Sequence, residues 1–279
     1  MPYLLALASS LLWGAGDFVG GTVSRRLPAV AVVGVSQALT LLVFTTVALA
    51  TGALAAGMPT ASWGWAVAAG AAGLVGLVAF YQALATGTMG VVAPLAALGV
   101  LVPVAVGLAE GERPSVVQAV GAMLGVAGGV LASGPEVRSR ASAWPVVLAL
   151  LAGVAFGLVL VFLSQASEGD GSPLLALVGM RLTSVGTLLV VATVLRSIGG
   201  VTPRDLPVLA LVGMLDGAAN LAYAVATTMG LLALVSVLAS LYPAVTVVLA
   251  RLVHHERMSR VQDAGIGAAI LGVLLVAAG

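Results

Sequence analysis

Three ionisable residues lie deep inside long apolar stretches of the chain. They are Asp17, Arg181 and Asp216. A charged side chain surrounded by hydrocarbon is costly, so such residues pair with one another or serve a function. For Arg181 and Asp216 two interpretations stay open. They form an internal ion pair that holds the structure together, or they contact a bound ligand.

Polar residues near these charges recur at helical spacing. Asp216 begins one stripe, in which successive members are separated by steps of 4, 3 and 4 residues. A second stripe contains Asp17, and a third lies near Pro243. The stripes are Asp216, Asn220, Tyr223 and Thr227; Ser10, Trp13, Asp17 and Ser24; and Ser236, Ser240 and Pro243. Such stripes on apolar helices face another helix or a cavity, never lipid. A carboxylate, an amide and a phenol on one face favour a cavity.

The segments that position these residues are long and apolar. Of the 279 residues, 61% are hydrophobic and 8% are charged, whereas about 25% are charged in a soluble domain. A helix that crosses a bilayer needs about 20 apolar residues. The sequence therefore predicts an all-α integral membrane protein with ten transmembrane helices. The predicted helices are 3–22, 29–51, 62–86, 89–108, 115–133, 144–165, 173–195, 206–228, 231–250 and 262–278.

The first of these helices is predicted to be retained rather than cleaved. A signal peptide opens with basic residues and ends at a cleavage site. No basic residue precedes Leu4, and Asp17 interrupts the apolar stretch.

The chain repeats itself with a period of about half its length. Short motifs recur 140 to 144 positions apart: Thr88-Met89-Gly90 with Thr228-Met229-Gly230, Pro103 with Pro243, Gln118-x-x-Gly121 with Gln262-x-x-Gly265, Gly128 with Gly272, and Trp13-Gly14 with Phe156-Gly157. Internal duplication of a helix bundle is typical of transporter folds. Ten helices in two copies means five in each, so the copies must enter the membrane in opposite directions. We predict two inverted five-helix repeats, 1–137 and 138–279.

Charges in equivalent loops agree with this inversion. The loop after the first helix carries Arg25 and Arg26, whereas its counterpart carries Glu168 and Asp170. The loop after the fourth helix is mainly acidic, with Glu110, Glu112 and a single Arg113. Its counterpart after the ninth helix is basic and carries Arg251, His254, His255, Arg257 and Arg260. Opposite charge in equivalent loops is expected of an inverted repeat.

These motifs resemble the EamA group of ten-helix transporters in the drug/metabolite transporter superfamily. The resemblance is carried by Leu12-Trp13-Gly14, Pro103, Gly111-Glu112-Arg113 and Gln118-x-x-Gly121, and in the second half by Pro243, His255-Glu256-Arg257 and Gln262-x-x-Gly265. There are two departures. His255 replaces the usual Gly, and Pro103 lies four residues closer to its Glu than Pro243 does. The resemblance implies transport and leaves the cargo open.

We therefore predict a secondary transporter that moves a small metabolite or drug-like molecule by alternating access around a site at the membrane midplane. The predicted substrate-binding residues are Trp13, Asp17, Tyr81, Gln82, Arg181, Asp216, Asn220 and Tyr223. Aromatic side chains would enclose the substrate. Arg181 would meet a substrate carboxylate or neutralise Asp216. Asp17, placed similarly to the helix-1 Glu of the small multidrug resistance proteins, would handle a proton or a cation, because a low dielectric favours the neutral carboxyl.

Other classes of function have little support in the sequence. There is no Cys, and the two His residues, His254 and His255, are adjacent in a charged loop, without the spacing of a zinc helix. We predict no cofactor, no metal and no enzymatic activity. A net charge of +1 predicts no nucleic-acid partner. The alternative is a non-transporting polytopic membrane protein: a sensor, an assembly factor or a lipid-active enzyme. The expected partners are a small molecule, the bilayer and, as one option, protons, with the chain a monomer or a homodimer.

Glycine and proline also have predicted roles. Gly121, Gly125 and Gly129 favour close helix packing, as do Gly70, Gly73 and Gly76. Pro94, Pro103 and Pro243 are expected to act as hinges or as static kinks.

The arginine distribution predicts the orientation in the cell membrane. With both termini outside, nine arginines face the cytoplasm and only Arg113 faces outward. The nine are Arg25, Arg26, Arg138, Arg140, Arg196, Arg204, Arg251, Arg257 and Arg260. Arginine counts in short loops set topology. The resemblance implies the reverse, with both termini in the cytoplasm, and we favour the charge count.

Overall fold

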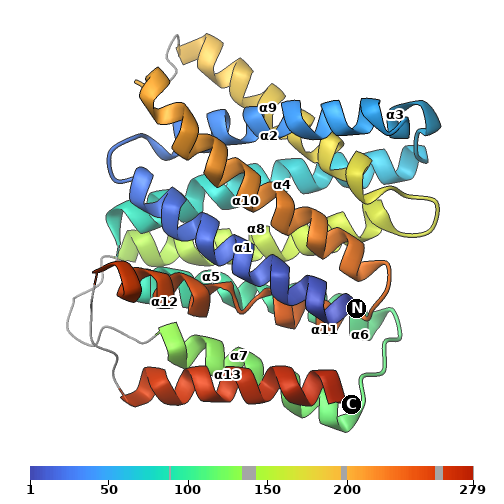
Figure 1. The fold of residues 1–279 in the computed structure, drawn as a ribbon, viewed down its shortest axis with the longest axis vertical. Helices are drawn as coiled ribbons and strands as arrows, with labels where there is room; N and C mark the ends of the chain where they lie inside the picture. The colour runs from blue at the N-terminus through green and yellow to red at the C-terminus, as the bar shows by residue number, and fades with distance from the viewer. Residues whose placement is uncertain (88, 134–142, 196–199, 255–259, 279) are drawn as a thin grey trace.

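The computed structural model describes residues 1–87, 89–133, 143–195, 200–254 and 260–278, and all regular secondary structure within these ranges is helical (Figure 1). The elements are α1 Pro2–Val23, α2 Ala29–Ala50, α3 Ala53–Ala56, α4 Thr60–Thr86, α5 Met89–Ala97, η1 Leu98–Val100, α6 Leu101–Ala109, α7 Val116–Ser133, α8 Ala143–Ser167, α9 Pro173–Leu195, η2 Pro203–Asp205, α10 Leu206–Thr227, α11 Leu232–Ala239, α12 Tyr242–His254 and α13 Arg260–Ala278. The predicted boundary between residues 137 and 138 lies outside the described ranges.

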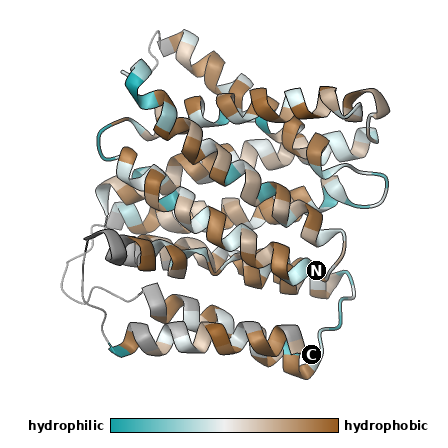
Figure 2. Cartoon of the chain, in the orientation of Figure 1, coloured by the Kyte–Doolittle hydropathy of each residue, from teal (hydrophilic) through white to brown (hydrophobic). Residues whose placement is uncertain are grey.

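Within the described ranges, six helices are long and apolar enough to cross a membrane: α1, α2, α4, α8, α9 and α10. Four shorter apolar stretches complete the bundle, at Leu95–Ala109, Val116–Gly128, Leu232–Thr246 and Gly267–Val276. Hydrophilic residues gather at the two ends of the bundle, while apolar residues dominate its length (Figure 2). The predicted all-helical membrane architecture is confirmed, and the count of ten spans stays a prediction.

Two of the predicted helices are interrupted near their middle. The stretch 89–108 changes to a 3₁₀ turn at Leu98–Val100, and the stretch 231–250 stops at Ala239 and resumes at Tyr242. Each break includes or directly follows the residue four positions before a proline, Gly99 for Pro103 and Ala239 for Pro243. A proline cannot donate to that carbonyl, and its ring clashes with it. The breaks therefore follow from the two prolines that the repeat places in equivalent positions.

Helix contacts recur between the two halves of the chain. Helix α1 packs on α10, α11 and α12, and α8 packs on α4, α5 and η1. Helices α1 and α8 run in opposite directions along the bundle (Figure 1). A Cβ atom on Gly14 would lie 2.7 Å from the carbonyl oxygen of Tyr242, and one on Gly157 would lie 2.8 Å from the Cβ of Val102. Tyr242 and Val102 are 140 positions apart, so the same close approach occurs twice.

Helices α7 and α13 form a close pair along one side of the bundle (Figure 1). A Cβ atom on Gly121 would lie 2.8 Å from the backbone of Gly272, and a Cβ on Gly128 would lie 2.8 Å from the Cα of Ala269. The small residues of α7 thus allow the two backbones to approach, as the glycine spacing predicts.

Polar contacts between distant segments lie at both ends of the bundle. At one end Arg26 Nη1 donates to Asp205 Oδ1 at 2.5 Å. At the other end the Glu112 carboxylate accepts from the backbone amides of Leu232 and Ala233, the latter at 2.9 Å. Glu112 therefore caps the start of α11, where backbone amides lack helical partners.

Both termini lie at one end of the bundle, and the α1–α2 connection with Arg25 and Arg26 lies at the other (Figure 1). Four of the arginines counted for orientation fall outside the described residues, as do two further residues of the second motif copy, to which Arg257 also belongs. They are Arg138, Arg140, Arg196 and Arg257, with His255 and Glu256.

Candidate functional site

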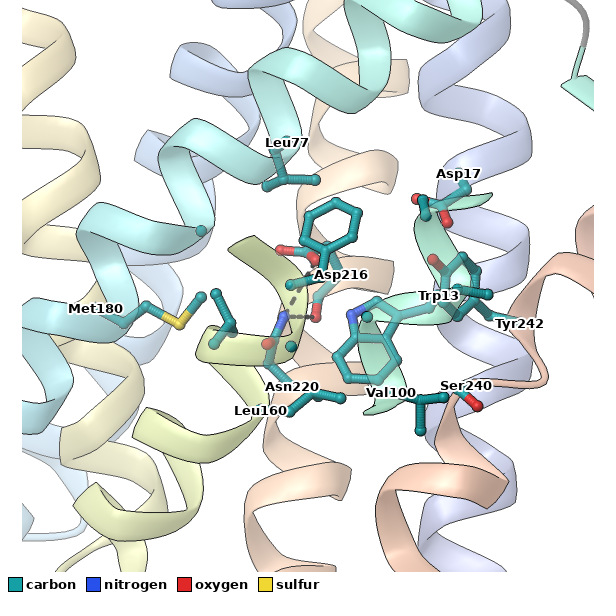
Figure 3. A pocket seen from close by; sticks show the side chains of 17 residues that line it. Trp13, Asp17, Leu77, Val100, Leu160, Met180, Asp216, Asn220, Ser240 and Tyr242 are labelled. Atoms are coloured by element: carbon teal, nitrogen blue, oxygen red, sulfur yellow. Dashed lines mark hydrogen bonds between the residues drawn. The ribbon is translucent and has the colours of Figure 1, made fainter. Parts of the chain in front are cut away.

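A pocket lies inside the bundle, bounded by α1, α4, α5, η1, α8, α9, α10 and the α11–α12 break (Figure 3). Its void volume is about 630 Å³ including its opening and the adjoining open space. Most of its lining is apolar or glycine. The lining residues with polar groups are Trp13, Asp17, Asp216, Asn220, Ser240 and Tyr242.

Asp17 and Trp13 enter the pocket from the same face of α1. They are four residues apart, about one helical turn, so their side chains share a face. Asp17 is 7% exposed. Within the described part of the chain, its carboxylate has no hydrogen-bond or ion-pair partner. A buried carboxylate without a partner is costly, and in a cavity it is a candidate ligand-binding group.

Arg181 and Asp216 form an ion pair between α9 and α10. Arg181 Nη2 lies 2.5 Å from Asp216 Oδ2. Asn220 Nδ2, one turn further along α10, donates to Asp216 Oδ1 at 3.1 Å and to the Asp216 carbonyl oxygen at 2.7 Å. The arginine side chain is fully buried, whereas the Asp216 side chain is 14% exposed and reaches the pocket. The positive charge therefore lies behind the wall that the carboxylate forms.

Tyr223 supports the pocket from behind. Its hydroxyl donates to the Leu160 carbonyl oxygen at 3.2 Å and shares a hydrogen bond of 2.8 Å with the Ser236 hydroxyl. Its ring centroid lies 5.9 Å from that of Trp13. The predicted stripe on α10 thus divides: Asp216 and Asn220 face the pocket, and Tyr223 joins α10 to α8 and α11.

Tyr81 and Gln82 lie away from the pocket lining. Tyr81 is buried, with its ring centroid 6.2 Å from that of Phe80 and its hydroxyl against Gly20. Gln82, the next residue on α4, is exposed. Four of the eight predicted site residues line the pocket, and Arg181 and Tyr223 lie directly behind it. Tyr81 and Gln82 are the two that lie elsewhere.

Two aromatic residues of the pocket were not among the predicted site residues. Tyr242 follows the α11–α12 break, and its ring centroid lies 6.4 Å from that of Trp13. Phe156, on α8, packs edge-on against Phe80 with centroids 5.5 Å apart. The repeat contained a signal for Phe156, because it pairs with Trp13 at a spacing of 143. Tyr242 directly precedes Pro243, and only the proline was singled out.

Comparison with known proteins gives the family. The model of the EamA-like transporter family matches residues 1–134 and 143–278. The chain belongs to the EamA-like transporter family. This family groups transporters rather than enzymes, so the chain is a transporter-type membrane protein of many helices.

Two further comparisons bear on this EamA-like transporter. No functionally curated protein matches it. Among the solved structures that match, one crystal structure superposes with a TM-score of 0.78 at 17% sequence identity, covering 98% of this chain and 95% of the other. At that identity the likeness shows the fold alone.

Proposed function

We propose that this EamA-like transporter moves a small metabolite or drug-like molecule across the cell membrane by alternating access. The observation that carries the proposal is the pocket itself. It lies inside the bundle, between helices of both halves of the chain, and it brings together polar side chains from α1, α10 and the α11–α12 break. Sites of this kind, built beside interrupted helices, are typical of secondary transporters.

Two inverted five-helix repeats would supply the moving parts. The repeated contacts of α1 and α8, their opposite directions and the paired glycine approaches support this arrangement. In such a fold one repeat rocks against the other around a fixed site, which opens the site to each side of the membrane in turn.

The two helix breaks are the proposed hinges. Ala97, beside the first break, and Ser240, at the second, line the main pocket. Both also line a separate void, about 270 Å³ including its opening, which Val126 and Val130 of α7 bound on the other side. Interrupted hydrogen-bond ladders bend more readily than intact ones, which favours movement at the two breaks.

The substrate site that we propose is centred on Trp13, Asp17, Asp216 and Asn220. Arg181 neutralises Asp216 rather than meeting a substrate carboxylate, because its side chain is fully buried. The Tyr223 ring packs against Trp13 and so supports that wall of the pocket. Tyr81 and Gln82 have no place at the pocket in this conformation. Asp17 is the proposed proton- or cation-binding carboxylate.

The test is flux in proteoliposomes that contain the purified protein. A panel of amines, amino acids and phosphorylated metabolites would be offered with and without a pH gradient. Saturable flux that responds to the gradient supports proton-coupled transport, and flux without that response indicates a passive facilitator. If no substrate moves, the alternative of a non-transporting membrane protein is favoured.

A further inference from the structure

The pocket holds more acidic side chains than the described basic side chains can pair. Two carboxylates, Asp17 and Asp216, line it. Arg181 is the one cation paired to either within the described ranges, and it is bonded to Asp216. Asp17 is left without a partner among the residues that the structure describes. A monovalent cation in the pocket would complete the charge balance that the protein leaves open.

Aromatic rings form much of the wall around this carboxylate. Trp13 and Tyr242 lie with their ring planes 71° apart, and Phe156 lines the pocket from α8. Figure 3 shows Asp17, Trp13 and Tyr242 gathered on one side of the pocket, with Asp216 and Asn220 nearby. The faces of such rings attract organic cations, most strongly where water is excluded.

Tyr242 adds an unused polar group. Its side chain is 8% exposed, and its hydroxyl has no hydrogen-bond partner among the described residues. A buried hydroxyl without a partner is uncommon in a folded protein. The Tyr242 side chain lines the pocket, but its hydroxyl oxygen is buried, so the phenol presents no donor to an anion in this conformation.

An anionic ligand would find few donors in this pocket. The Asn220 amide already donates to Asp216 twice, and the Arg181 side chain has no exposed surface. A carboxylate or phosphate would lie close to two protein carboxylates, and repulsion between like charges is strong at low dielectric. The pocket is therefore unsuited to phosphorylated metabolites and to acids.

We propose that the pocket binds an organic monocation, an amine or quaternary ammonium on an aromatic or apolar body, with Asp17 as its counter-ion. Trp13, Phe156 and Tyr242 enclose the cationic head. Leu77, Leu160 and Met180 contact the apolar body. This substrate class rests on the proposed function for its biological meaning, but the binding itself requires no transport.

The test compares three ligands with the same ring and different charge. Isothermal titration calorimetry on purified protein would use phenethylamine, phenylalanine and 3-phenylpropionate, which are a cation, a zwitterion and an anion at neutral pH. We expect phenethylamine to bind at least tenfold more tightly than either other ligand. Equal or tighter binding of phenylalanine or 3-phenylpropionate, or no binding of phenethylamine, overturns the proposal.

A variant pair assigns the binding to Asp17. Asp17→Asn removes the charge and keeps the shape, and Asp170→Asn makes the same change at an exposed loop residue. We expect Asp17→Asn to weaken phenethylamine binding roughly tenfold to a hundredfold, the range of a hydrogen bond to a charged group. Asp170→Asn should leave it unchanged, and unchanged binding in Asp17→Asn refutes the assignment. Because calorimetry needs no flux, phenethylamine binding without transport would refute only the proposed function.

Discussion

The Arg181 guanidinium and the Asp216 carboxylate lie 2.5 Å apart, and they join α9 to α10 with the arginine fully buried and the carboxylate on the wall of the pocket. Two guanidinium nitrogens of Arg181, Nε and Nη1, have no hydrogen-bond partner within the described residues. The pair is thus only partly satisfied. This ion pair keeps the Asp216 carboxylate charged at the pocket wall. Loss of either partner is expected to lower both the stability of the fold and the rate of transport.

The first prediction separates these two effects. Arg181→Ala and Asp216→Asn should each abolish flux and lower stability by about 3–5 kcal/mol, because one buried charge loses its partner. The double variant Arg181→Met with Asp216→Leu should recover much of the melting temperature, since an apolar pair replaces the ions. Its flux should stay absent. Wild-type flux in that double variant would show that the pair has a structural role alone.

Asp17 is predicted to carry the pH dependence of transport. Asp17→Asn should remove the response of proteoliposome flux to a pH gradient, because an asparagine amide does not bind or release a proton at the pH values of a flux assay. Among the described residues, the other titratable or charged groups near this carboxylate are Asp216 on α10, Tyr81 on α4, Tyr242 on α12 and, behind Asp216, Arg181 on α9. Asp170→Asn is the matched control. A pH response that survives in Asp17→Asn would transfer the role to Asp216.

Glu112 is predicted to stabilise the start of α11. Glu112→Ala leaves the amides of Leu232 and Ala233 without their acceptor, which should cost about 1–3 kcal/mol. Glu110→Ala, two residues away, removes one exposed hydrogen bond to Gln165 and should change stability by about 0.5 kcal/mol or less. Thermal melting in detergent measures both variants. Equal melting temperatures would show that the cap contributes nothing.

Gly14 is predicted to tolerate no side chain. A Cβ there would lie 2.5 Å from the Cβ of Val245 and 2.7 Å from the carbonyl oxygen of Tyr242. Gly14→Ala should therefore lower stability by about 1–3 kcal/mol through overpacking. Gly186→Ala is the matched control, because its Cβ meets nothing within 4 Å; it should be neutral or stabilising by up to about 1 kcal/mol. A stable Gly14→Ala variant would mean that α1 and α12 are not packed so closely in the membrane.

The orientation is tested with fusions at the C-terminus, next to the end of α13. One reporter is active only in the cytoplasm and the other only outside. The arginine excess at the end of the bundle away from the termini predicts a signal from the outside reporter alone. A signal from the cytoplasmic reporter alone would reverse the orientation and favour the family pattern over the charge count.

Much of this protein could be predicted from its sequence, because the bilayer restricts what an apolar chain can form. Helices must satisfy their own backbone groups in hydrocarbon, so long apolar stretches become helices and charges fall between them. The repeat and its prolines then place two breaks in equivalent helices. The pairing of Arg181 with Asp216 was one of two alternatives that the sequence left open, since charges in hydrocarbon pair with one another or serve a function.

What the tertiary structure alone decided is which polar residues share the pocket. Helical spacing puts Asp216, Asn220 and Tyr223 on one face, but a face about 100° wide can meet both a cavity and a neighbouring helix. Tyr223 reaches the Leu160 carbonyl on α8, and Gln82 turns outward, because the rotation of each helix is set by its neighbours. Tyr242 lines the pocket as the first residue of α12, directly after the helix break that begins at Ala239. These outcomes depend on contacts between segments more than 60 residues apart, and no local pattern in the sequence specifies them.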